Sequence, residues 1–145
     1  MTVHLQPHVD APPPWRIGWL AGGVLLGATG TTLLHLHDPN AADSPFAPCI
    51  FHALTGYWCP SCGITRMLHA LVHGDILRAL EMNPLAVLLL PFGVLAWAWA
   101  GGWRPAWTAP VIRIMARPLL WAVVLSGYWI ARNLPWPPFQ WLAPG

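Results

Sequence analysis

The sequence predicts an all-α integral membrane protein with about three transmembrane helices, and two observations lead to this fold class. Hydrophobic residues make up 56% of the 145 residues and charged residues only 8%, whereas soluble domains carry about 25% charged residues. Three long apolar runs flank a polar segment that holds all three cysteines. So few charges cannot cover a soluble fold, which excludes an ordinary cytosolic enzyme and a nucleic-acid-binding protein. The partner that this composition predicts is the lipid bilayer.

Residues 15–36 are predicted to form the first transmembrane helix, after a disordered, proline-rich tail over residues 1–14. A helix of that length covers about 33 Å, enough for a hydrocarbon core of roughly 30 Å. A cleaved signal peptide is the alternative, but the apolar run is long and no lysine or arginine precedes it. Glycines spaced four apart predict close packing against another span, a second copy or another membrane protein. These glycines are Gly18, Gly22, Gly23 and Gly27.

Residues 84–103 and 111–134 are predicted to form the second and third transmembrane helices. Pro91 predicts a kink within the second helix. The prolines that follow residue 134 end the third helix and leave residues 135–145 as a C-terminal tail. Arginines near the ends of the third run are expected to extend to the lipid head groups, namely Arg113, Arg117 and Arg132.

Residues 37–83 are predicted to lie on the membrane surface as a Cys-rich loop followed by two short amphipathic helices. Asp75 is suited to cap the second of these helices, expected over residues 76–82. The first has one apolar stripe at helical spacing, formed by Ile64, Met67, Leu68, Leu71 and Val72.

The start of the first short helix is expected at Cys59, with Pro60 in the first helical position. Cys62 then lies in the first turn, where free backbone N–H groups and the helix dipole favour a thiolate. Along the same polar face follow Arg66, His69 and His73, which are either functional or simply solvated. Arg66 is able to pair with a carboxylate such as Asp75 or Glu81.

The cysteines allow several interpretations. Cys49 and His52 form C-x2-H and Cys59 and Cys62 form C-x2-C, which together give a Cys3His set that zinc accepts in structural sites. A disulfide would fix the same loop without metal. Alternatively, Cys59 and Cys62 cycle as a redox dithiol, because a Trp before C-x2-C is typical of thioredoxin-type sites. No strand-helix-strand pattern surrounds the motif, and the cysteines also fit as small apolar fillers.

The order of these residues resembles a bacterial membrane-protein family catalogued as domain-of-unknown-function family 2752. Its pattern is a Leu-Thr-Gly, a Cys-Pro-x-Cys-Gly-x-Thr-Arg, a Gly-Asp and an Asn-Pro before an apolar helix. The resemblance covers about residues 46–95 and implies a small integral membrane protein, but it supplies no reaction. The signature positions that it marks are Cys59, Pro60, Cys62, Gly63, Thr65, Arg66, Gly74, Asp75, Asn83 and Pro84.

Arginine counts favour a cytoplasmic N-terminus, with four arginines on that side of a three-span protein and three on the other. The Cys-rich segment is then expected in the periplasm, with the spans in a bacterial inner membrane. The leading functional prediction is a non-enzymatic accessory or assembly component whose Cys-x-x-Cys loop is fixed by a disulfide or zinc. A membrane thiol–disulfide oxidoreductase using Cys59 and Cys62 is the alternative. A transporter or channel component is less favoured because the spans hold almost no ionisable residues.

Overall fold

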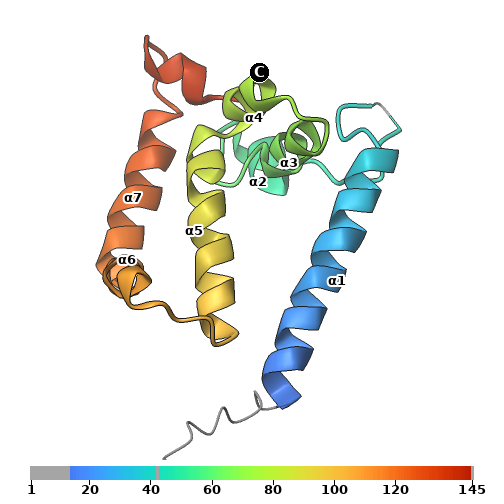
Figure 1. The fold of residues 1–145 in the computed structure, drawn as a ribbon. Coiled ribbons are helices and arrows are strands. Elements are labelled where there is room, and N and C mark those ends of the chain that lie inside the picture. The colour runs from blue at the N-terminus through green and yellow to red at the C-terminus, as the bar shows by residue number, and fades with distance from the viewer. Residues whose placement is uncertain (1–13, 42, 145) are drawn as a thin grey trace, which may run out of the picture.

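The computed structural model describes residues 14–41 and 43–144, and every regular element in these ranges is helical. Most of the predicted N-terminal tail lies outside the described residues. Long helices run lengthwise, the short helices α2, α3 and α4 gather at one end, and α6 lies at the other (Figure 1). In chain order the elements are α1 (Pro14–Leu36), α2 (Ile50–Thr55), α3 (Ile64–Val72), α4 (Ile76–Met82), α5 (Pro84–Ala100), η1 (Ala106–Thr108), α6 (Ala109–Met115), α7 (Pro118–Ala131) and η2 (Phe139–Leu142).

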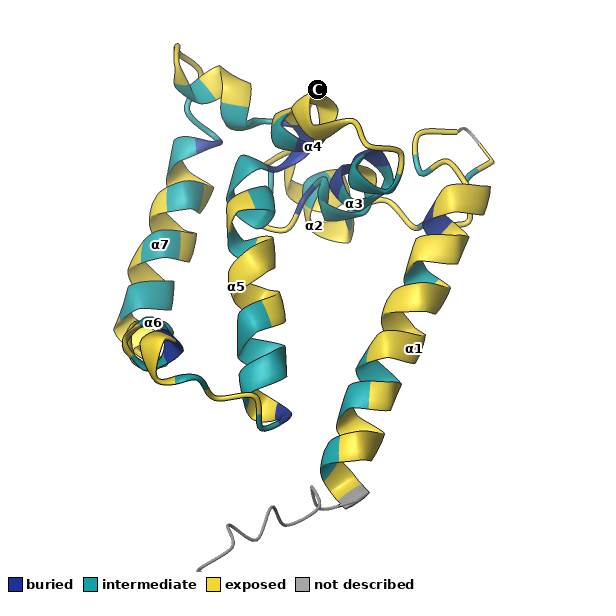
Figure 2. Ribbon diagram, in the orientation of Figure 1, coloured by how far each residue is buried: buried dark blue, intermediate teal, exposed yellow. Residues whose placement is uncertain are grey.

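Helices α1 and α7 are exposed along most of their length and α5 is exposed or half-buried throughout, whereas the buried residues gather mainly among the short helices (Figure 2). Only 6% of the apolar window of α1 is buried, and that helix is long and apolar enough to cross a membrane. Two bent pairs, α4 with α5 and α6 with α7, bring the number of candidate spans to three if each pair counts as one. Such exposed apolar helices need an apolar environment, since water would leave most of their hydrophobic surface unburied.

The third predicted span, residues 111–134, is wrong as a single helix. The chain forms α6 and α7 instead, with an angle of 62° between the α6 segment and α7. Arg117 has extended backbone angles, φ −84° and ψ 113°, because the ring of Pro118 excludes the helical conformation at the residue before it. The predicted tail over residues 135–145 is also partly structured, since η2 packs against α4.

The short helices form the core of the fold. Met67, Ala70, Ala79 and Met82 are buried together where α3 crosses α4. The apolar stripe predicted for α3 is confirmed, because Ile64, Leu68 and Leu71 also pack against this cluster. The predicted cap is confirmed as well: the Asp75 carboxylate accepts a hydrogen bond of 2.9 Å from the Arg78 backbone N–H at the start of α4.

Two local expectations for the Cys-rich segment are wrong. The segment contains a third short helix, α2, between Cys49 and Gly56. The helix expected to begin at Cys59 begins instead at Ile64, after Gly63. Gly63 has φ +85°, a left-handed conformation that interrupts a right-handed helix and that glycine adopts without steric cost.

One of the four glycines of α1 that were predicted to pack closely contacts another long helix. A Cβ atom at Gly23 would overlap the indole ring of Trp97 on α5, so this glycine allows close approach within the chain. Gly18, Gly22 and Gly27 have open space around them. Close packing of these three against a further partner stays a prediction.

Candidate functional site

The three cysteines converge at the end of the molecule where the short helices lie. The Sγ atoms of Cys59 and Cys62 are 2.7 Å apart, and those of Cys49 and Cys59 are 3.4 Å apart. All three sulfur atoms lie within 4.8 Å of one another. Cys62 is buried, and Cys49 and Cys59 are half-buried. No pair is at disulfide distance, so the structure presents three free thiols as one cluster.

The Cys59-Pro60-Ser61-Cys62 stretch, called here the CPSC turn, is held through its carbonyl groups by Arg132. This arginine follows the last residue of α7. Its guanidinium group donates to the carbonyl oxygens of Cys59 at 2.9 Å, Pro60 at 3.2 Å, and Cys62 at 3.2 and 3.3 Å. Arg132 is only 1% exposed. The expectation that it extends to the lipid head groups is therefore wrong, because its two terminal nitrogens donate to these carbonyl groups inside the protein. Its Nε is also buried and has no hydrogen-bond partner among the described residues.

Asn83, between α4 and α5, holds the same turn from another side. Its Nδ2 donates to the carbonyl oxygens of Pro60 at 3.0 Å and Cys62 at 3.1 Å. Its Oδ1 caps α5 by accepting from the Ala86 N–H, and it also accepts from the Tyr128 hydroxyl at 3.0 Å. The side chain is fully buried, so one amide joins the turn, α5 and α7 in a satisfied network.

Asn133 completes the attachment of the turn to the end of α7. Its Oδ1 accepts from the Trp58 backbone N–H and its Nδ2 donates to the Trp58 carbonyl oxygen, both at 2.8 Å. These paired bonds fix the residue immediately before Cys59. Together with Arg132, they make the position of the sulfur atoms depend on the end of α7.

Gly63 lets the chain leave the turn. Besides its left-handed backbone, a Cβ atom at this position would lie 2.6 Å from the carbonyl oxygen of Met82. Real Cβ atoms do not approach a carbonyl so closely. Glycine is therefore required here both for conformation and for the close packing of the turn against the end of α4.

The two thiols of the turn have opposite pKa shifts. Burial alone raises the pKa of the Cys59 thiol, but hydrogen bonds from Cys62, Ser61 and Cys49 outweigh it and lower the pKa to about 7. Burial, followed by the hydrogen bond to Cys59, raises the pKa of the Cys62 thiol to about 12. The expectation of a lowered pKa at Cys62 is wrong, because this residue precedes α3 and does not lie in its first turn.

His52 is not one of the residues that the structure brings into the sulfur cluster. Its imidazole stacks on the Trp58 ring, with the ring centroids 3.6 Å apart and an interplanar angle of 12°. Its Nδ1 is buried without a hydrogen-bond partner among the described residues. The predicted Cys3His set is therefore present as three thiols, with the imidazole beside them on an aromatic neighbour.

Comparison with known families matches the part of the chain that runs from the cysteine cluster through most of α5. Residues 49–97 match the model of the family described as Protein of unknown function (DUF2752). All three cysteines lie within these matched residues, which are called here the DUF2752 segment. The resemblance expected from the sequence is thereby confirmed over a third of the chain. No curated protein and no solved structure matches the chain.

The DUF2752 segment also carries the polar face predicted on α3. Arg66, His69 and His73 line one pocket together with Asp75. Cys62, which is buried, lies apart from them in the CPSC turn. The expected pairing of Arg66 with a carboxylate is not seen: in the described part of the chain, Arg66 has no hydrogen bond and no ion pair.

Sequence reasoning missed the residues of α7 that hold the turn: Tyr128, Arg132 and Asn133. They lie outside the DUF2752 segment. The one available signal was an Arg-Asn pair directly after an apolar run, and this is equally typical of a helix that ends at the head groups. Only the tertiary contact, across more than 70 residues, distinguishes the two cases.

Proposed function

We propose that this chain is a non-enzymatic membrane protein in which Cys49, Cys59 and Cys62 bind a zinc ion that fixes the CPSC turn. The single observation that carries the proposal is the convergence of three sulfur atoms within 4.8 Å. Thiolates are the ligands that zinc prefers in structural sites. The role that this supports is that of an accessory or assembly component, whose ordered surface would present a turn to another protein.

The spacing of the sulfur atoms fits a tetrahedral ion after a small adjustment. Zinc–sulfur bonds of about 2.3 Å place two thiolates of a tetrahedral site about 3.8 Å apart. Cys49 and Cys59 are at 3.4 Å, and the 2.7 Å between Cys59 and Cys62 has to widen by about 1 Å. We propose that a rotation of the half-buried Cys59 side chain provides this widening.

The buried charge of Arg132 supports a negatively charged centre beside it. Three thiolates around Zn²⁺ carry a net charge of −1. Arg132 is buried and binds the carbonyl oxygens of two of the ligand residues, and it has no carboxylate partner among the described residues. A buried cation without a counter-charge is costly, and a zinc–trithiolate centre would supply that counter-charge.

Metal analysis of the purified protein in detergent tests the proposal. The wild type is expected to bind one zinc ion per chain, and Cys49→Ser, Cys59→Ser and Cys62→Ser each to lose it. Ser61→Ala is the matched control, because its hydroxyl lies 3.3 Å from the Cys59 sulfur without being a proposed ligand. Full zinc content in all three cysteine variants would overturn the proposal, as would wild-type protein that takes up no zinc.

The proposed location is a bacterial inner membrane, with the Cys-rich segment on the periplasmic side. It rests on the apolar helices and on the distribution of arginines between the two sides. Labelling of the cysteines in intact cells with a membrane-impermeant maleimide tests the orientation. Labelling only after the membrane is opened would place the segment in the cytoplasm.

A second candidate function, thiol–disulfide exchange, is favoured by the opposite pKa shifts of Cys59 and Cys62. The Cys59 thiolate would attack a client disulfide and release one client thiolate. Cys62 would then attack the Cys59 sulfur, so that a Cys59–Cys62 disulfide forms and the second client sulfur leaves as a thiol. Two electrons pass to the client, and its disulfide is the oxidant. A client trapped as a mixed disulfide by Cys62→Ser, and not by Cys59→Ser, would establish this function.

A further inference from the structure

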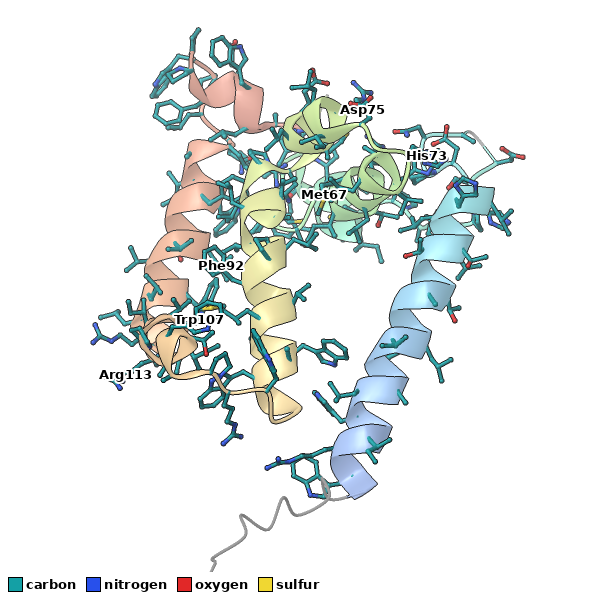
Figure 3. All side chains as sticks on the ribbon, viewed as in Figure 1. Met67, His73, Asp75, Phe92, Trp107 and Arg113 are labelled. Atoms are coloured by element: carbon teal, nitrogen blue, oxygen red, sulfur yellow. The ribbon has the colours of Figure 1, made fainter. Side chains whose placement is uncertain are left out.

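A second polar site lies beside the cysteine cluster and shares none of its sulfur atoms. It is a pocket of about 210 Å³ between the end of α1 and the helices α3 and α4. His73 and Asp75 mark it in Figure 3, at the end of the molecule opposite Arg113. Its lining residues are Asn40, Arg66, His69, Ala70, His73, Asp75, Arg78 and Met82.

The charged groups of the pocket differ in how far they are already paired. Two guanidinium groups and one carboxylate line it, and two further carboxylates lie at its edge, with Asp38 3.7 Å from His69 and Glu81 3.1 Å from Arg78. The carboxylate of Asp75 is already used, because it accepts the Arg78 N–H that begins α4. Arg78 pairs with Glu81 through one nitrogen at 3.1 Å, which leaves further guanidinium donors. Arg66 has no such partner in the described ranges, so all N–H donors of its guanidinium group are available to a ligand.

His69 and His73 line one side of the pocket, and hydrogen bonds hold both rings in place. Nδ1 of His69 lies 2.6 Å from the Leu34 carbonyl oxygen, and Nδ1 of His73 lies 2.9 Å from the carbonyl oxygen of His69. In each ring the Nδ1–H therefore donates to a carbonyl oxygen. The His73 ring also stacks on His35, with the ring centroids 4.9 Å apart, and lies tilted against His69, with the centroids 4.3 Å apart. The hydrogen bond of His69 to Leu34 and the stacking of His73 on His35 thus join α3 to the end of α1.

The position of the pocket near the end of α1 indicates which part of a lipid could reach it. Within residues 14–41 and 43–144, α1 is the helix long enough to cross a membrane alone, and it ends at Leu36. Asn40, four residues later, lines the pocket. The end of a transmembrane helix lies at the level of the lipid phosphates, outside the hydrocarbon core. Arginine binds phosphate oxygens in a bidentate manner, which makes Arg66 suited to this group.

We propose that this pocket binds a phosphate group, with Arg66 as the principal ligand and Arg78 as the second. The chemistry is that of a phosphate ester at the membrane surface, and inorganic phosphate presents the same oxygen atoms. The site is independent of the proposed zinc centre, since no cysteine lines it. Arg66→Gln is accordingly expected to retain the metal content of the wild type.

Titration calorimetry on the full chain in an uncharged maltoside detergent tests the site, at constant ionic strength set with chloride. Inorganic phosphate and dioctanoyl phosphatidylglycerol are the two probes. Arg66→Gln is expected to weaken binding about tenfold or more, because a charge-assisted bidentate contact contributes about 1.5–3 kcal/mol. Arg78→Gln should weaken it less. Arg113→Gln, an exposed arginine on α6, is the matched control and should leave binding unchanged.

The probes distinguish the source of the phosphate. Binding of the lipid alone identifies a headgroup as the ligand, and binding of both probes identifies the phosphate group itself. If neither probe binds the wild type, or if Arg66→Gln and Arg78→Gln both bind like Arg113→Gln, the proposal is overturned. The elution volume in gel filtration establishes whether each variant is folded. If Arg66→Gln is not folded, the binding of the two probes to Arg78→Gln tests the proposal.

Discussion

The guanidinium group of Arg132 donates two hydrogen bonds to the carbonyl oxygen of Cys62, from 70 residues further along the chain. One end of this contact follows α7, and the other is the last cysteine of the cluster. Because Arg132 is buried and binds backbone carbonyl groups of the CPSC turn, a movement of the backbone of the turn would be transmitted to the end of α7. We therefore expect the backbone beneath the cysteine cluster and the last candidate span to be energetically coupled.

Replacing Arg132 should test that coupling. Arg132→Met removes donors from three carbonyl groups of the CPSC turn, and we expect it to lower the free energy of unfolding by about 2–3 kcal/mol. If the arginine also balances a zinc–thiolate charge, zinc affinity should fall about tenfold or more, in line with a loss of 1.4 kcal/mol per factor of ten. Denaturant titration in detergent and competition with a zinc chelator measure the two effects. Arg113→Met, at the opposite end, should change neither (Figure 3).

Substitutions at Asn83 and Tyr128 should show which hydrogen bonds of Asn83 contribute most to the free energy of unfolding. Asn83→Asp retains the acceptor that caps α5 but loses the two N–H donors to the turn, and the buried carboxylate would face two carbonyl oxygens. We expect a loss of about 3 kcal/mol or more, since a buried charge is added to the lost hydrogen bonds. Tyr128→Phe removes one hydrogen bond to the same residue and should cost about 1 kcal/mol. Equal losses in the two variants would show that the donors to the turn contribute little.

Gly63 and Gly74 provide a matched pair. Both have left-handed backbones, with φ +85° and +78°, but only Gly63 packs against a carbonyl oxygen, that of Met82. Gly74→Ala should therefore cost roughly 1–2 kcal/mol from conformation alone. Gly63→Ala should cost about 3 kcal/mol or more, because the Met82 backbone must also move. Thermal unfolding of both proteins in the same detergent compares them, and similar midpoints would contradict the close approach at Gly63.

Local signals predicted much of this fold. Asp75 and Asn83 were recognisable as boundaries because capping and the residue before a proline depend on a few neighbouring residues. The apolar stripe of α3 could be predicted because it too depends only on residues close together in the sequence. The break at Arg117 had a local cause too, but the apolar composition on both sides of Pro118 favoured one continuous span.

Tertiary contacts explain what the sequence did not reveal about the site. The C-x2-H and C-x2-C spacings predicted that Cys49, Cys59 and Cys62 belong together, and their three sulfur atoms do converge. The start of α3 was misplaced because Gly63 adopts a left-handed backbone only in combination with the packing against Met82. The role of Arg132 depends wholly on distant carbonyl groups, so no local pattern could indicate it.

The alkylation rate of Cys59 should report its lowered pKa. The thiolate is the reactive form, so the rate rises with pH and reaches half its maximum at the pKa of the thiol. With a pKa of about 7, the alkylation rate of Cys59 in metal-free, reduced protein should level off above about pH 8. For an ordinary thiol with a pKa near 8.5, the alkylation rate would continue to rise above that pH. Cys62, whose pKa is raised to about 12, should stay almost unreactive. Iodoacetamide labelling followed by peptide mass spectrometry measures both sites, and a Cys59 midpoint near 9 would contradict the hydrogen-bonded thiolate.

Substitution at Cys49 and His52 should decide between three and four protein ligands at the proposed zinc centre. Cys49 contributes one of the three clustered sulfur atoms, so Cys49→Ser should reduce zinc content below one ion per chain. His52→Ala should leave one ion per chain, because the imidazole stacks on Trp58 outside the sulfur cluster. The fourth ligand would then be water or a partner's side chain, which a tetrahedral ion accepts. A loss of zinc in His52→Ala, with the protein still folded, would instead mean that the ring turns from Trp58 to the metal, since its Nδ1 is buried without a hydrogen-bond partner among the described residues.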